Sequence, residues 1–339
     1  MDTTIQNTQT NRLDYISWIQ FVGVISVIFG HSMNSIDVPL WLVNIKGWVY
    51  TYHMPLFFFV SAYLFSYLGG FERRGYKGTF KSKFERLLVP YIIWNVAFFA
   101  PKILMSDYIP ETVEWTPEYF IKLFFSPRDN ILGHTWFLFA LFEMYVLAIL
   151  FEKLRNTRQL WIPVLAMLII LNCFGINDRF LAVGDIMKNA IFFWVGLLLG
   201  GAKKETIIDW ANNKAFFVSL IILVVGCTVI WTFNKSMLIN LLILGFSILL
   251  LLGVLQIRYG IKWSFIDFVS QNSFCIYIVH WPILMVIRFV FYQKLDVAPI
   301  PSTAIMFFGG IALASIVAWT LRRCKTPFMK KINKFVFGM

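Results

Sequence analysis

Imidazole side chains are the groups in this 339-residue chain best suited to chemistry, and there are only four of them. All four lie at or inside long apolar segments: His31, His53, His134 and His280. Ionisable side chains are costly inside a bilayer, so those that occur there are candidates for functional sites. A histidine titrates near neutral pH, which suits it to remove a hydroxyl proton or to carry an acyl group covalently. The sequence therefore points to proton or acyl chemistry within a membrane.

The composition predicts that membrane-spanning helices position these histidines. Hydrophobic residues make up 59% of the chain, charged residues only 14%, and mean hydropathy is +0.70. A run of about 20 apolar residues spans a bilayer as a helix. We expect an all-α polytopic bundle that forms a single domain over residues 1–339, without a bound cofactor or metal site. Its ten predicted spans are 15–33, 48–68, 87–105, 134–151, 160–176, 185–201, 215–233, 237–257, 266–290 and 302–321.

Lys and Arg alternate between the predicted connections and indicate an orientation. They concentrate in the C-terminal tail and in the connections on one side, such as 69–86, whereas the opposite connection 106–133 carries five acidic residues. By the positive-inside rule, both termini are cytoplasmic and the histidines lie toward the outer leaflet. Orientation and anionic lipid account for the net charge of +12 without a nucleic-acid partner. A basic cytoplasmic mouth would also attract a polyanionic donor such as coenzyme A.

A polar stripe runs along the first predicted span. Gln20 precedes His31 by eleven residues, about three helical turns or roughly 16 Å, and Ser17 joins the same face. We expect this face to line one cavity, with Ser17 and Gln20 toward the substrate. Gln can hydrogen-bond a phosphate or carbonyl but cannot neutralise it. The alternative for His31 is a helix-end residue bonded to a carbonyl or a lipid headgroup.

The next two histidines have similar alternatives. His53 lies at the predicted depth of His31, so it either shares the His31 site or anchors its helix at the interface. His134 stands beside Trp136, and aromatic residues are common interfacial anchors. We consider a substrate-binding role for His134 alongside this anchoring role.

The ninth predicted span carries a second polar stripe. Ser273, Tyr277 and His280 follow an i, i+4, i+7 spacing, and Asn272 lies beside them. Such a stripe faces the bundle interior or a wet cavity in a membrane helix. The alternative is hydrogen bonding between helices.

Glu143 is a carboxylate in mid-span. It follows His134 by nine residues, about 13 Å deeper by helix rise. A carboxylate at this depth must be paired, protonated or hydrated. It is a candidate partner for a catalytic imidazole or a proton relay; the alternative is a structural pair with Arg288 or a tyrosine.

Five motifs occur along the chain in a fixed order. They are RLDYISWIQFVGVISVIFGHS (12–32), YTYHMPLFFFVSAYLF (50–65), KFERLLVPYIIWN (83–95), HTWFLFALFEMY (134–145) and QNSFCIYIVHWPI (271–283). Together they resemble membrane acyltransferase family 3, and within it the fucose 4-O-acetylase-like branch, across the whole chain. The family pattern has a basic residue at the position of Gln20 and an acidic one at Ser17, so this chain lacks both charges.

The resemblance implies an O-acetyltransferase of the bacterial cytoplasmic membrane. Acetyl-CoA would donate the acetyl group, and a sugar hydroxyl of a surface or extracellular polysaccharide, or of its lipid-linked precursor, would accept it. A homo-oligomer is possible. From the residues and the resemblance together, we expect catalytic roles for His31, His53, Glu143 and His280. We expect substrate-binding roles for Ser17, Gln20, His134, Asn272, Ser273 and Tyr277.

Two other functions remain open. A sugar or proton transporter or a flippase would also explain intramembrane Glu and His residues, but the chain shows no internal repeat. A catalytically inactive relative would explain the departures at Ser17 and Gln20.

Overall fold

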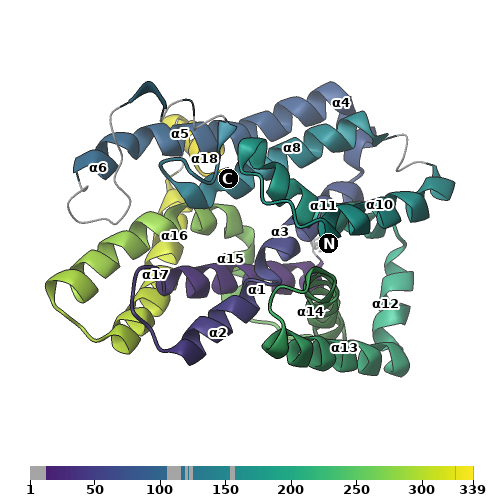
Figure 1. Cartoon of the computed structure of the whole chain (residues 1–339). Coiled ribbons are helices and arrows are strands. Elements are labelled where there is room, and N and C mark those ends of the chain that lie inside the picture. Colours follow the sequence, from purple (N-terminus) through teal and green to yellow (C-terminus); the bar gives the residue numbers. More distant parts are fainter. Residues whose placement is uncertain are drawn as a thin grey trace, which may run out of the picture.

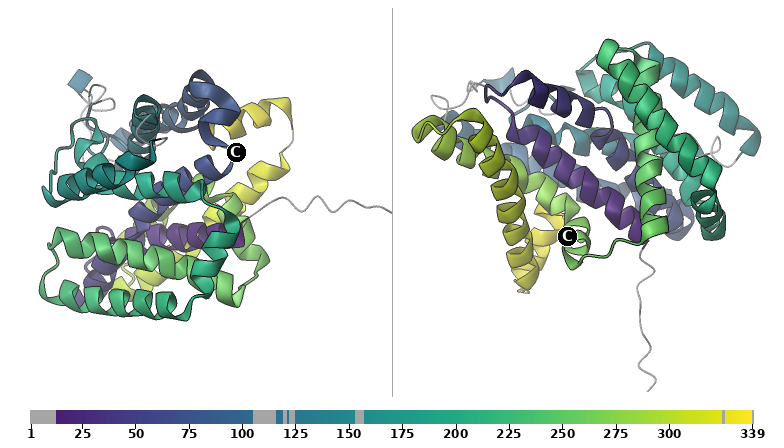
Figure 2. Two further views of the ribbon diagram at one scale, coloured as in Figure 1. Left: turned by 90° about the vertical axis from the view of Figure 1, so that its right-hand side faces the viewer. Right: turned by 90° about the horizontal axis from the view of Figure 1, so that it is seen from below.

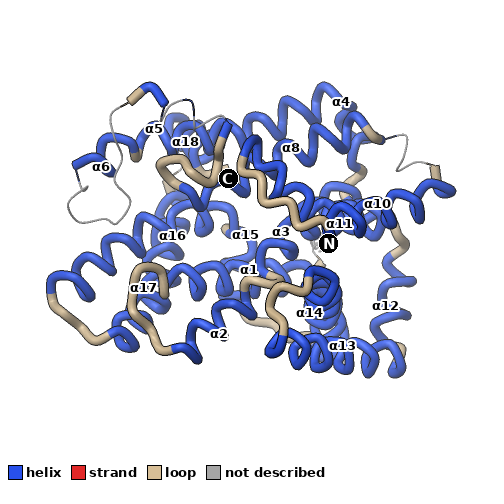
Figure 3. The backbone as a smooth tube through the Cα atoms, viewed as in Figure 1, coloured by secondary structure: helices blue, strands red, loops and turns tan. Residues whose placement is uncertain are grey.

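The computed structural model describes residues 13–104, 116–118, 121, 125–152, 157–324 and 326–338. All regular structure among these residues is helical (Figures 1 and 3). Most of the acidic connection 106–133 lies outside the described residues, as do the basic residues Lys153, Arg155 and Lys325.

The helical elements follow one another with short connections. In chain order they are α1 (Asp14–Ser32), α2 (Leu40–Val49), α3 (His53–Tyr67), α4 (Gly70–Lys83), the π-helix η1 (Phe84–Leu88), α5 (Val89–Ala97), α6 (Phe99–Leu104), the 3₁₀ turn η3 (Gly133–Thr135), α8 (Trp136–Leu150), η4 (Arg158–Leu160), α10 (Trp161–Cys173), η5 (Phe180–Ala182), α11 (Val183–Gly200), α12 (Lys204–Asn212), α13 (Lys214–Phe233), α14 (Leu238–Tyr259), α15 (Ser264–Gln271), α16 (Ser273–Ile287), the π-helix η6 (Arg288–Lys294), α17 (Pro299–Arg323) and α18 (Pro327–Val336).

Eight helical segments of the described chain are long and apolar enough to cross a membrane. They coincide with eight of the predicted spans, so the prediction of an all-α polytopic membrane bundle is confirmed. The other two predicted spans correspond to α3, with 15 residues, and α10, with 13 residues. At 1.5 Å per residue these helices reach only about 20–23 Å, less than the ~30 Å of a hydrocarbon core. A turn at residues 50–52 separates α2 from α3 and shortens the predicted second span.

Two predicted boundaries are wrong. The basic connection 69–86 is largely helical: α4 begins after Gly69 (φ +88°), is kinked at Gly75 (φ +62°), and continues through η1 into α5. The predicted span 266–290 is broken at Asn272, where the backbone leaves helical geometry between α15 and α16.

α3 lies at the centre of the bundle and is packed by α1, α11 and α14 (Figures 1 and 2). Its closest neighbour is α11, which approaches through Gly196 and Gly200, one turn apart. A Cβ atom added at Gly196 would lie 2.4 Å from the carbonyl oxygen of Phe59, and one at Gly200 would lie 2.3 Å from that of Tyr63. Small residues at this spacing let membrane helices approach backbone to backbone. The α3–α11 contact therefore fixes the position of His53, the first residue of α3.

We predict that Gly196→Ala destabilises the fold. The added methyl group would collide with backbone, which cannot move aside as a flexible side chain can, so we expect a loss of about 1–3 kcal/mol. The measurement is the free energy of unfolding, or the thermal midpoint, of the purified protein in detergent. Gly226→Ala in α13 is the matched control, because nothing lies within 4 Å of its added Cβ. Equal stability of the two variants would contradict the proposed close packing.

Candidate active site

The four histidines converge at one end of the bundle from four different elements. His280, in the middle of α16, is fully buried between two others. Its ring centroid lies 5.3 Å from that of His31 and 5.4 Å from that of His134. Trp281 packs beside both, with ring centroids 4.9 Å from His31 and 5.7 Å from His134. His31, His53 and His134 line a common cavity of about 350 Å³, the histidine cavity.

Short-range hydrogen bonds hold three of these imidazoles. The Nδ1–H of His53 donates to the carbonyl oxygen of Val49 at 3.1 Å, one turn earlier. The Nδ1–H of His280 donates to the carbonyl oxygen of Tyr277 at 2.5 Å, while its Nε2 has no partner among the described residues. The Nδ1 of His31 instead accepts a hydrogen bond of 3.0 Å from the side-chain amide of Asn34.

A contact between the turn after α1 and helix α2 supports His31. The ammonium group of Lys46 in α2 donates to Oδ1 of Asn34 at 2.6 Å. Burial lowers the pKa of Lys46 from its ordinary value, which reflects how little water reaches this ammonium group. Arg288 also donates to the backbone carbonyl of Asn34 at 3.5 Å. Asn34 and Lys46 are not among the site residues predicted from the sequence. The contact of Asn34 with His31 could have been expected, because residues three apart are neighbours on a helix.

Gly30 gives the ring of Tyr50 room beside the histidines. A Cβ atom at Gly30 would lie only 2.2 Å from the Tyr50 ring. That ring lines the histidine cavity, with its centroid 4.7 Å from that of His53. The glycine immediately before His31 therefore lets a second aromatic wall form.

An ion pair closes another side of the histidine cavity. Arg128 contacts Asp185 through two hydrogen bonds, of 2.5 and 2.7 Å. The guanidinium carbon of Arg128 lies 4.0 Å from the ring centroid of Trp136. Asn172, Lys188 and Asn189 complete the polar lining. No sequence pattern connects Arg128 with Asp185, because the two residues are 57 positions apart.

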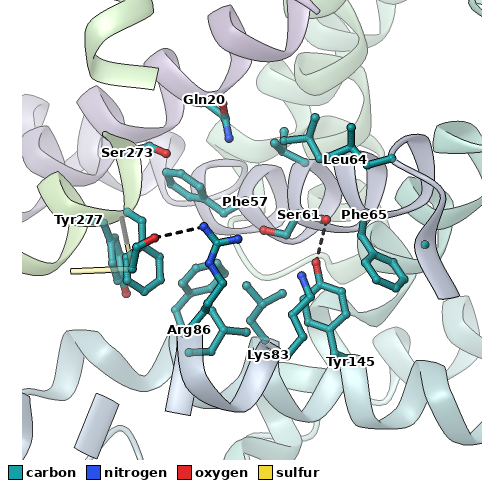
Figure 4. A pocket seen from close by; sticks show the side chains of 18 of the residues that line it. Gln20, Phe57, Ser61, Leu64, Phe65, Lys83, Arg86, Tyr145, Ser273 and Tyr277 are labelled. Atoms are coloured by element: carbon teal, nitrogen blue, oxygen red, sulfur yellow. Dashed lines mark hydrogen bonds between the residues drawn. The ribbon is translucent and has the colours of Figure 1, made fainter. Parts of the chain in front are cut away.

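A second cavity, of about 330 Å³, has no histidine among its lining residues and is basic (Figure 4). Gln20, Ser273 and Tyr277 line it together with the basic side chains of Arg73, Arg74, Lys83 and Arg86. Tyr277 lines both cavities, and its hydroxyl donates to the backbone carbonyl of His134. We call this second site the basic cavity. Tyr277 therefore lies at the boundary between the two cavities.

The structure separates two residues that we expected to face one cavity. Gln20 lines the basic cavity, where its Oε1 accepts a hydrogen bond of 2.7 Å from the hydroxyl of Ser270. His31 lines the histidine cavity. Both do lie along α1, but Gln20 is absent from the lining of the histidine cavity and His31 is absent from that of the basic cavity. The prediction of a shared cavity is therefore wrong.

Four of the predicted site residues line neither cavity: the fully buried His280, and Ser17, Glu143 and Asn272. Ser17 and Asn272 are buried, and the side-chain amide of Asn272 donates to the carbonyl oxygen of Phe268. Glu143 is half-buried, and its Oε2 has no hydrogen-bond partner among the described residues. Arg288, an alternative partner for Glu143, instead reaches the backbone of Asn34. In the described part of the chain, no group of three or more His, Cys, Asp or Glu side chains is placed to hold a metal ion.

We predict that Arg128→Leu destabilises the protein by about 1–3 kcal/mol, because it leaves the carboxylate of Asp185 unpaired. The Asp185 side chain is only 7% exposed, whereas that of Arg128 is 41% exposed. Because water partly screens the ion pair on the Arg128 side, we expect a loss of stability of only this size. The double variant Arg128→Leu/Asp185→Leu should recover much of the loss because no unpaired charge remains. Thermal midpoints of the wild type, both single variants and the double variant test this. A double variant no more stable than Arg128→Leu would exclude a buried-charge penalty.

Comparisons with known proteins identify the family of this chain. The sequence profile of a family described as "Acyltransferase domain", acyltransferase family 3, matches residues 13–319. Two similar proteins are both named "Glucans biosynthesis protein C", one from Shigella dysenteriae serotype 1 (strain Sd197) and one from Escherichia coli (strain K12 / DH10B). Each is 27% identical over 151 residues, which cover 42% of this chain and 39% of the relative. The match thus spans about two fifths of each relative's length.

No solved structure matches the chain at a significant level. The family match nevertheless covers nearly all of the described helices, from the start of α1 into α17. It includes both cavities except for the C-terminal residue Gly338. The chain is therefore a multi-pass membrane protein that belongs to acyltransferase family 3, and it is an acyltransferase.

Proposed function

We propose that this protein transfers an acetyl group from acetyl-CoA to a sugar hydroxyl. The acceptor is a bacterial surface or extracellular polysaccharide or its lipid-linked precursor, and the membrane is the bacterial cytoplasmic membrane with both termini inside. One observation carries the proposal: a basic cavity and a cavity lined by imidazoles meet at Tyr277. An enzyme that joins a polyanionic donor to a neutral hydroxyl acceptor needs two such chemically different sites.

The basic cavity suits the phosphates of coenzyme A. A surface groove shares Arg74 and Arg86 with it and adds Lys81, together with Lys334, whose ammonium group pairs with Glu85 at 2.8 Å. Arginine side chains bind phosphate oxygens in a bidentate manner, and lysines add positive charge. The positive-inside rule places this side in the cytoplasm. These arginines would supply the positive charge toward the donor phosphates that Gln20 cannot provide.

The histidine cavity suits a sugar. Tyr50 and Trp136 supply aromatic walls, and Asn172, Asp185 and Asn189 supply hydrogen-bonding groups. Sites for small polar molecules combine apolar walls with a few placed polar groups in this way. The name of the similar proteins refers to glucan biosynthesis, which favours a glycan acceptor.

The chemistry requires a proton acceptor beside the acceptor hydroxyl. An imidazole takes the hydroxyl proton as the oxygen attacks the thioester carbonyl carbon. The carbon–sulfur bond then breaks, and the thiolate takes the proton from the imidazolium. The products are the acetylated sugar and free coenzyme A.

We predict that purified protein in nanodiscs cleaves acetyl-CoA when a glycan acceptor is present, and that His31→Ala lowers the rate by about 10²–10⁴. Thiol release and acetylated product are measured together. A transporter or an inactive relative would release no thiol. Near-normal turnover in a folded His31→Ala variant would remove His31 from the mechanism.

We predict that Arg86→Gln raises the KM for acetyl-CoA by about tenfold and leaves kcat nearly unchanged, because it removes a charged hydrogen bond to phosphate. Lys204→Gln is the control, since Lys204 is exposed in α12 and lines neither cavity. Equal KM values for the two variants would place the donor elsewhere.

A further inference from the structure

The hydrogen bonds of the histidines determine where each neutral ring carries its proton. A backbone carbonyl only accepts hydrogen bonds, so a ring nitrogen that bonds it must bear the hydrogen. His53 and His280 bond carbonyl oxygens through Nδ1. Each neutral ring therefore has a lone pair on Nε2. Of these two, His53 lines the histidine cavity, whereas His280 is fully buried and lines neither cavity.

His31 has the opposite arrangement. Its Nδ1 meets the NH₂ group of Asn34 at 3.0 Å, and an amide NH₂ group only donates. Asn34 cannot turn its oxygen toward the ring without losing the 2.6 Å hydrogen bond from Lys46 to that oxygen. An ammonium group has no acceptor, so Lys46 fixes which way the amide points. The neutral His31 ring therefore carries its proton on Nε2.

From these contacts we infer that Asn34 and Lys46 are positioning residues that hold His31 as a hydrogen-bond donor, while His53 supplies the lone pair that acts as the base. The inference rests on the proposed acetyl transfer and divides the work between two imidazoles that line one cavity. In this arrangement His31 donates a hydrogen bond and does not remove a proton. A partner that sets the tautomer of a functional histidine is a recurrent device at metal and catalytic sites.

The two roles complete the acyl-transfer step. Nε2 of His53 takes the proton of the sugar hydroxyl as that oxygen forms a bond to the thioester carbon. The Nε2–H of His31 donates to the carbonyl oxygen as negative charge develops there. When the carbon–sulfur bond breaks, the departing thiolate takes the proton back from His53. No redox partner is required, and His31 keeps its proton throughout.

The first experiment reads the tautomers directly. Nitrogen-15 NMR of histidine-labelled full chain in nanodiscs should show only four imidazoles, each assignable by a single His→Gln substitution. We expect His31 to be protonated on Nε2, and His53 and His280 to be protonated on Nδ1. A His31 signal protonated on Nδ1 in the wild type would overturn the inference, whether or not acetyl transfer is detected.

The second experiment changes the tautomer. Asn34→Asp presents a carboxylate, which only accepts, so His31 should move its proton to Nδ1. Losing one donor to a developing oxyanion typically lowers kcat by about 10²–10³, with the donor KM within about twofold of wild type. Asn44→Asp is the matched control, because Asn44 in α2 also accepts from a lysine, Lys235, at 2.6 Å but contacts no histidine. It should change neither the tautomers nor kcat.

Lys46 variants test the same inference if Asn34→Asp does not fold. Lys46→Met frees the Asn34 amide to turn, so His31 should become a mixture of tautomers and kcat should fall by the same fraction. The arginine in Lys46→Arg can still only donate, so this variant should keep the wild-type His31 tautomer and the wild-type kcat. Across all variants, kcat should follow the fraction of His31 that is protonated on Nε2. A variant with a shifted tautomer and wild-type kcat would overturn the donor role, while failure of the wild type to transfer acetyl would refute the proposed function alone.

Discussion

The backbone contact between α3 and α11 is the constraint on which both cavities depend. Gly196 and Gly200 bring α11 against the carbonyl oxygens of α3, where any side chain would hold the helices apart. α3 then contributes His53 and Met54 to the histidine cavity and Ser61 and Leu64 to the basic cavity. α11 contributes polar lining residues to the histidine cavity. In lipid, packing of small residues replaces the hydrophobic effect that would drive such an approach in water.

Around this pair, aromatic residues divide the interior rather than leaving one open channel. The ring of Tyr277 packs 5.5 Å from Phe137 and 5.9 Å from His134, measured between centroids. Its hydroxyl donates a hydrogen bond to the backbone of the η3 turn, which precedes α8. The position of the Tyr277 ring between the cavities therefore depends on both α16 and the start of α8. The basic side chains and the imidazoles thereby line separate cavities, and Tyr277 lines both. Such a division suits a reaction whose two substrates differ in charge.

The sequence predicted the features that follow from composition and local spacing. Apolar run length located eight helices long enough to span a membrane, and three of the four histidines singled out in the sequence line one cavity in the structure. It did not predict that Gln20 and His31 open to different cavities, because helical spacing gives a shared face but not the side chains that fill the space along it. Nor did it predict the contact of Arg128 with Asp185, which depends on tertiary packing across 57 residues. The Asn34–Lys46 interaction joins the turn after α1 to helix α2, a contact that no local spacing predicts.

The shortness of α3 has an electrical consequence. Its 15 residues reach about 23 Å, and a cavity lies toward each of its ends, so the low-dielectric barrier between the cavities is thinner than the surrounding bilayer. A membrane potential falls mainly across that barrier, so its field is concentrated near the ring of Tyr277. Moving one elementary charge through the full potential changes its energy by about 2.3 kcal/mol per 100 mV. A neutral group that crossed this layer would not sense the voltage, whereas a proton or a thiolate that crossed it would couple the reaction to the membrane potential.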